Sequence, residues 1–170
     1  MKQVIYLLIF LIIPFFSIAQ DKNVIKQQAL IVAAATKVLD YNTIIKYTHS
    51  SLINMMGGRD AMFKTIENSM GKMSAQGISI DSAAIGNPET IYIAGEELHC
   101  LVPQTIIMTV PNGKLVSNSY LLAISQDKGM NWTFINVSSQ LNNKTITRLL
   151  PNFNQELKIP EDTKPVFYKD

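Results

Sequence analysis

The sequence contains few of the residues that give a small protein recognisable chemistry. It has one cysteine, Cys100, so no internal disulfide can form. It has two histidines, His49 and His99, and none of the C-x-x-C, H-x-x-x-H or H-E-x-x-H spacings that are typical of metal sites. The G-x-S-x-G turn of many hydrolases is also missing. We therefore predict no metal and no cofactor.

Charged residues are scarce as well. They make up 16% of the 170 residues, 15 Lys and Arg stand against 13 Asp and Glu, and no run of basic residues occurs. Nucleic acids and anionic membranes both require a concentrated basic surface, so we expect neither as a partner. The hydrophobic content of 47% is too high for a disordered chain, and the length supports one domain.

The first twenty residues have the pattern of a secretory signal peptide. Lys2 precedes an apolar run at residues 4–13, and Ser17-Ile18-Ala19 provides the small residues of a cleavage site. The alternative is a retained membrane anchor, but a run of about ten residues is short of the roughly 20 that a spanning helix needs. We predict an exported protein, periplasmic or extracellular, with no stable membrane insertion after cleavage.

Helical periodicity dominates the next part of the chain. A stripe of residues recurs every three or four positions over residues 22–39, which indicates an amphipathic helix. Its members are Ile25, Ala29, Val32, Thr36 and Leu39. Asp40 is placed to cap a short second helix. Gly57 and Gly58 interrupt the chain, and Asp60 is a candidate cap for a third helix over residues 60–74.

After Gly77 the apolar period changes to two, which indicates strands. The candidate strands are 78–81, 91–93, 98–110, 115–125 and 132–137. Asn112-Gly113 between two of them is a strong hairpin signal. We predict an α+β domain over residues 21–150, with the N-terminal helices in the concave face of a curved, mainly antiparallel meander sheet. Residues 151–170 are predicted to form an irregular tail.

This order of elements resembles the NTF2-like superfamily, the cone-shaped α+β domains that include nuclear transport factor 2 and ketosteroid isomerase. The resembling parts are helix 22–39, the break at Tyr47-Thr48-His49-Ser50, the Gly57-Gly58-Arg59-Asp60 helix start, the strands around Asn112-Gly113, and Gly129 to Ile135. More narrowly, the chain is similar to exported bacterial proteins of this shape. The resemblance implies a cone with one open end, and it does not assign a function because the superfamily contains enzymes and non-enzymes.

Three residues are candidates for acid–base chemistry: His49, His99 and Asp40. A carboxylate base with a tyrosine donor would suit an isomerase, and a histidine base would suit a dehydratase-type lyase. The competing interpretation makes Asp40 a helix cap and Tyr41 and Tyr47 half-buried packing residues. Glu96 or Glu97 could complete a metal site with both histidines, although Glu and His near a strand start are commonly just a solvated edge.

Tyr41, Tyr47 and Trp132 are candidates for lining the pocket, and packing against the helices is the alternative for each. We expect a non-catalytic domain that binds a small apolar ligand or a protein through its cone or sheet face. The alternatives are a lyase or isomerase with an acid–base pair in the cone, and a structural module that dimerises through the sheet face.

Overall fold

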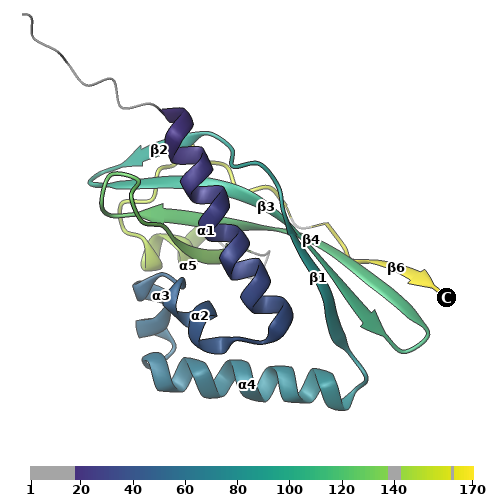
Figure 1. Ribbon diagram of the computed structural model, residues 1–170. Helices are drawn as coiled ribbons and strands as arrows, with labels where there is room; N and C mark the ends of the chain where they lie inside the picture. Colours follow the sequence, from purple (N-terminus) through teal and green to yellow (C-terminus); the bar gives the residue numbers. More distant parts are fainter. Residues whose placement is uncertain (1–17, 138–142, 162) are drawn as a thin grey trace, which may run out of the picture.

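The computed structural model describes residues 18–137, 143–161 and 163–170. The helices are α1 (Ile18–Val38), α2 (Tyr41–Lys46), α3 (Ser50–Met55), α4 (Arg59–Ala75) and α5 (Asn143–Leu149). The strands are β1 (Ser79–Ile85), β2 (Ile91–Ala94), β3 (Glu97–Val110), β4 (Gly113–Ser125), β5 (Thr133–Val137) and β6 (Val166–Lys169). The predicted signal peptide lies outside the described residues except for its last three, which begin α1 (Figure 1).

The α+β prediction is confirmed. All named strand pairs are antiparallel, and the sheet is open, with the order β1-β3-β4-β5. Two short strands extend it, since β2 pairs with β3 and β6 pairs with β4. The sheet is therefore not a simple meander, because β3 is long enough to pair with β1 and β2 at different points along one edge.

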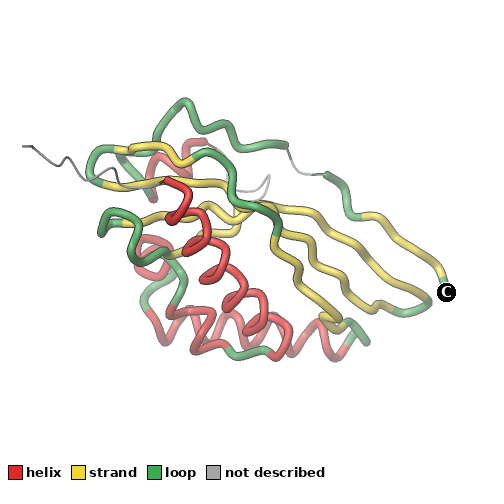
Figure 2. Tube along the Cα trace, turned by 45° about the horizontal axis from the view of Figure 1, so that its top comes forward, coloured by secondary structure: helices red, strands yellow, loops and turns green. Residues whose placement is uncertain are grey.

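Helices α1 to α4 lie on one side of the sheet, and the end of the β3–β4 hairpin projects past them (Figure 2). The apolar stripe of α1 is buried as predicted, with Ile25, Ala29 and Val32 in contact with the sheet. Leu39 was assigned to this stripe but is 41% exposed, because α1 ends at Val38 and Leu39 turns the chain with a φ of 58°.

Local capping explains where the next helices begin. Asp40 caps α2 as predicted, and its carboxylate accepts from the backbone N–H of Thr43. For α4 the predicted cap Asp60 is wrong: the cap is Gly58, whose φ of 97° suits glycine, and Asp60 lies in the first turn. A carboxylate in that turn still interacts favourably with the positive end of the helix dipole.

The predicted hairpin is present, but its turn lies one residue earlier than expected. Pro111 and Asn112 form the two-residue loop, Asn112 has a φ of 70°, and Gly113 already belongs to β4. Gly113 is needed for a different reason. A Cβ atom there would collide with the carbonyl oxygen of Tyr168 and lie 2.9 Å from the ring of Phe167, so glycine lets β6 pair closely with β4.

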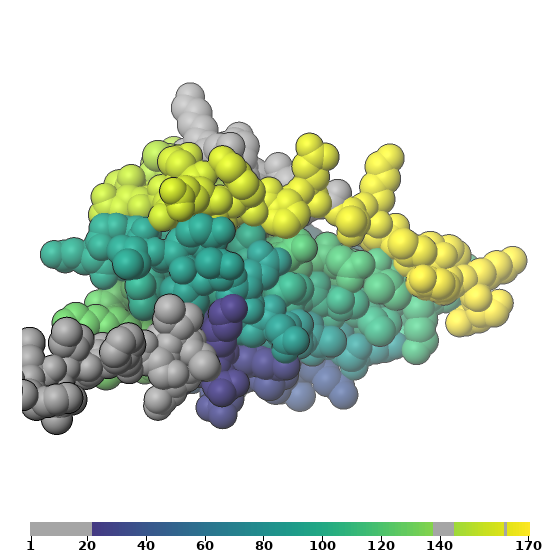
Figure 3. Space-filling model, turned by 90° about the horizontal axis from the view of Figure 1, so that it is seen from above, coloured from purple at the N-terminus to yellow at the C-terminus, as the bar shows by residue number. Residues whose placement is uncertain are grey.

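Two hydrophobic clusters cover the two faces of the sheet. On the helical face, α1 packs against alternate residues of β3, β4 and β5 together with Trp132. The other face is covered by α5 and the segment that follows it, which contribute Ile146, Leu149, Leu150 and Leu157. The space-filling view shows this C-terminal segment on the side of the sheet away from the helices (Figure 3).

The C-terminal segment thus differs from the predicted irregular tail. Leu157 is buried in the second cluster, and Val166–Lys169 forms β6. Proline spacing indicated the breaks in this segment but not its packing. Within the described part of the chain, no helix is both long and apolar enough to span a membrane.

Candidate functional site

The concave side of the sheet contains a cavity of about 140 Å³ between α1, α2 and the strands. Most of its wall is apolar and comes from Val32, Ile44, Ile106, Leu121 and Phe134. The polar wall residues are Thr36, Tyr47, Thr48, Gln104 and Asn136. No histidine, carboxylate, lysine or cysteine is among these lining residues.

Two amide side chains give this cavity its polar character. Gln104 is buried, and its Oε1 accepts from Nδ2 of Asn136 at 3.3 Å and from the hydroxyl of Ser119 at 3.4 Å. Nε2 of Gln104 donates to no residue that the structure describes. The cavity therefore offers an amide donor inside an apolar wall, which suits a ligand with one hydrogen-bond acceptor.

Of the three predicted pocket residues, only Tyr47 lines this cavity. The ring of Tyr41 packs edge to face on Phe63, with 5.5 Å between centroids, and joins α2 to α4. Trp132 is buried against α1, and its indole N–H donates to the carbonyl oxygen of Gly129 over 2.9 Å.

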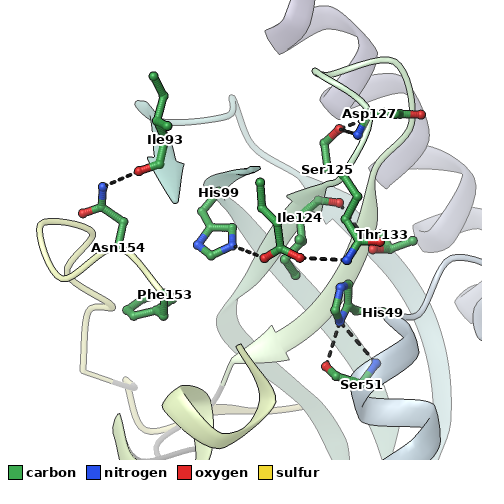
Figure 4. A network of polar contacts seen from close by, with 12 residues as sticks. His49, Ser51, Ile93, His99, Ile124, Ser125, Asp127, Thr133, Phe153 and Asn154 are labelled. Atoms are coloured by element: carbon green, nitrogen blue, oxygen red, sulfur yellow. Dashed lines mark hydrogen bonds and ion pairs between the residues drawn. The ribbon is translucent and has the colours of Figure 1, made fainter. Parts of the chain in front are cut away.

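The two histidines come together at the end of the sheet, and neither of them lines the cavity. His99 points from β3 to the face opposite α1, where its ring stacks on Phe153 with 5.7 Å between centroids. Nε2 of His99 donates to Oε2 of Glu97 over 3.1 Å, and Gln126 donates to Oε1 of the same carboxylate over 2.7 Å. His49 lies beside this network (Figure 4).

The backbone explains how His49 reaches this place. Thr48 forms a parallel bridge with Phe134, and the N–H of His49 donates to the carbonyl oxygen of Phe134. The chain therefore runs along the edge of β5, and His49 becomes the N-cap of α3. Its Nδ1 accepts from the backbone N–H of Ser51 at 3.3 Å.

These contacts determine the protonation of both rings. Nδ1 of His49 accepts, so its proton is on Nε2, and this buried nitrogen has no hydrogen-bond partner among the described residues. An ionised carboxylate can only accept, so His99 carries its proton on Nε2, which leaves the buried Nδ1 without a partner in the described structure.

Burial lowers the pKa of both His49 and His99 below the ordinary value of 6.5, and nearby Glu97 offsets only part of this effect. Burial alone would raise the pKa of Glu97, but hydrogen bonds from Gln126 and His99 outweigh it and lower the pKa below 4.5. At neutral pH the cluster therefore contains two neutral imidazoles and one carboxylate.

Glu97 also faces a separate pocket of about 300 Å³ at this end of the sheet. The other lining residues are Gly95, Glu96, Gln126 and Asn152. They come from the β2–β3 turn, the loop after β4 and the C-terminal segment. A larger hollow of about 380 Å³ lies between strands β3 and β4 and the C-terminal segment. Its lining residues are Pro103, Gln104, Thr105, Asn118, Ser119, Tyr120, Pro160, Glu161 and Thr163. None of the predicted site residues lines that hollow.

The remaining candidates lie elsewhere. Asp40 is exposed, and its carboxylate accepts hydrogen bonds from the backbone N–H and the hydroxyl of Thr43. Cys100 is buried on the α1 face, opposite to its neighbour His99, and burial raises the pKa of its thiol to about 12. Among the described residues, no group of three or more His, Cys, Asp and Glu side chains could hold a metal ion.

Sequence reasoning missed Gln104 and Asn136. Each interrupts an apolar strand, Gln104 between Pro103 and Thr105 and Asn136 between Ile135 and Val137. A polar residue on the buried face of such a strand is a usable signal, because buried polar groups require partners. Glu97 was considered only as a possible third group beside the histidines.

Comparison with known proteins does not assign the chain to a family. No protein-family model, no curated protein and no solved structure matches it.

Proposed function

We propose that the protein is an exported NTF2-like binding domain that holds a small, mainly apolar ligand in the concave cavity. The observation that carries this proposal is the pairing of Gln104 and Asn136 within an apolar wall. Helices followed by a curved antiparallel sheet support the NTF2-like assignment. The sequence pattern of residues 1–20 supports export.

Binding is favoured over catalysis at this cavity because its wall offers no carboxylate or histidine as a base. The volume of about 140 Å³ is close to that of apolar cavities that hold a single aromatic ring. The free donor of Gln104 adds a preference for a ligand with a hydroxyl or carbonyl oxygen.

Benzyl alcohol and toluene test the proposal, because they differ by one hydroxyl group. We expect benzyl alcohol to cause saturable NMR shifts at Tyr47 and at the side-chain amides of Gln104 and Asn136, and to bind more tightly than toluene. In Gln104→Leu this preference should fall by about 2- to 10-fold, the value of one hydrogen bond.

Gln27→Leu, on the exposed side of α1, is the matched control and should keep the preference. The proposal is wrong if neither compound shifts the cavity residues, or if Gln104→Leu and the wild type discriminate equally.

A further inference from the structure

Strand β6 forms a free outer edge of the sheet and leaves apolar side chains exposed. In the described part of the chain it pairs only with β4, and Figures 1 and 2 show it as the outermost strand beside the β3–β4 hairpin. Val166, Phe167 and Tyr168 are 49%, 51% and 57% exposed. Lysine and proline, which commonly block an edge, stand only at the ends of this strand. The edge is therefore open to a further strand.

The free edge also carries backbone groups that have no partner in the described sheet. The N–H of Asp170 donates to the carbonyl oxygen of Asn112, in the same register as the pairing of β6 with β4. In an antiparallel ladder, residue pairs that exchange hydrogen bonds alternate with pairs that do not. Tyr168 is therefore bonded to β4, whereas the N–H and C=O groups of Phe167 and Lys169 point outward.

A second copy of β6 matches this edge. Around a twofold axis that places Phe167 opposite its own copy, the two Phe167 residues exchange both backbone hydrogen bonds, because both point outward. The N–H of Lys169 then faces the carbonyl oxygen of Pro165 in the other copy. By the same alternation Pro165 also points outward, so its missing N–H removes no bond to β4.

The side chains are complementary in this register. Phe167 pairs with Phe167 on one face of the sheet, and Val166 pairs with Tyr168 on the other. Aromatic pairs and aromatic–β-branched pairs both stabilise adjacent strands. Lys164 lies opposite Asp170 at each end of the paired segment, so opposite charges face each other.

Other registers are less favourable. Placing Tyr168 opposite its own copy would set Asp170 against Val166 and Lys169 against Phe167, which removes the pairs of opposite charge. Centring the pairing on Lys169 would place like charges opposite each other. A register that sets Phe167 against Tyr168 would direct an outward group at one already bonded to β4.

We propose that β6 is a self-association strand through which two copies of the protein form a symmetric dimer, with one continuous sheet across both. The dimer uses the edge of the sheet rather than its face, and it does not depend on the ligand proposed for the concave cavity. Because one short strand from each copy takes part, the interface is small, and the dimer should form only at high micromolar protein concentrations.

Sedimentation equilibrium combined with amide hydrogen exchange tests this proposal. We expect a reversible monomer–dimer equilibrium, and a higher protein concentration should slow exchange of the backbone amides of Phe167 and Lys169. The amide of Tyr168 is bonded to β4 in both states and is the internal reference. A protein that stays monomeric up to about 1 mM would overturn the proposal. So would a dimer in which the amides of Phe167 and Lys169 exchange equally fast at low and high concentration.

Charge reversal tests the register. Lys164→Asp and Asp170→Lys each place like charges opposite each other, and each should weaken dimerisation by about tenfold. The double variant exchanges the two charges and should recover the wild-type affinity. Glu67→Lys reverses a charge on the exposed side of α4 and should have no effect. Failure of the double variant to recover, or equal weakening by Glu67→Lys, would contradict the register and with it the proposal.

A peptide of residues 164–170 separates a second copy from other occupants of the edge. It should compete with dimerisation and slow exchange of the amides of Phe167 and Lys169, whereas a peptide with these residues in scrambled order should not. Equal protection by both peptides would identify a general peptide-binding edge and would overturn the assignment to a second copy.

Discussion

The ring of His49 accepts a hydrogen bond from the backbone N–H of Ser51 through Nδ1, and the same nitrogen lies 2.7 Å from the Ser51 hydroxyl. A protonated imidazole has no acceptor, so this cap of α3 requires the neutral ring. Folding and protonation of His49 are therefore linked.

The first prediction is that acid destabilises the protein through its histidines. The pKa values of His49 and His99 are lower in the folded than in the unfolded chain, so below about pH 6.5 the unfolded chain binds more protons. The stabilisation is complete above that pH and is lost as the pH falls through the folded pKa values. Glu97, whose pKa is also lowered, adds a further loss below about pH 4.5.

Urea denaturation at about pH 7.5 and about pH 5 measures this effect as a fall in the midpoint. His49→Asn keeps a capping side chain and removes one titrating ring, so its midpoint should change less with pH. Equal pH dependence in the variant and the wild type would show that His49 does not contribute.

The second prediction compares two isoleucines on opposite sides of α1. Ile25 is fully buried in the cluster on the helical face, whereas Ile31 is 44% exposed. Ile25→Ala should lower the free energy of unfolding by about 2–5 kcal/mol through lost burial and a cavity. Ile31→Ala should change it by about 0.5 kcal/mol or less. Similar losses in urea denaturation would mean that α1 is rotated relative to the sheet.

The third prediction concerns the place where β6 approaches β4. In Gly113→Ala the added methyl group would collide with Tyr168 and Phe167, so β6 should separate from the sheet. We expect faster hydrogen exchange and proteolysis at residues 166–169. The buried residues of the cluster on the helical face should stay protected from exchange. Gly71→Ala is the matched control, because a Cβ there meets nothing within 4 Å and removal of a helical glycine should stabilise α4 by about 0.5–1 kcal/mol. Unchanged exchange of β6 in Gly113→Ala would contradict the prediction.

Much of the fold follows from local sequence patterns. The stripe of Ile25, Ala29 and Val32 predicted α1, and alternation predicted β3 and β4, because a buried face imposes its period on the sequence. The errors at Leu39 and Asp60 lie at helix ends, where a one-residue change in backbone conformation decides the boundary.

The candidate sites were harder to predict because they depend on contacts between distant segments. His49 and His99 were both singled out, but only the bridge between Thr48 and Phe134 brings His49 to the end of the sheet. Likewise, Gln104 and Asn136 become partners through the pairing of β4 with both β3 and β5. The packing of Leu157 on the second face left no periodic pattern, since that segment has no regular secondary structure.

The burial of Leu157 has a consequence for the timing of folding during synthesis. One face of the sheet stays uncovered until α5 and the residues after it have been made, which is later than the synthesis of β1 to β5. The nascent chain can form its helices and hairpin early. The two-sided core can close only once α5 and Leu157 have been made, so this segment sets the moment at which the domain becomes fully folded.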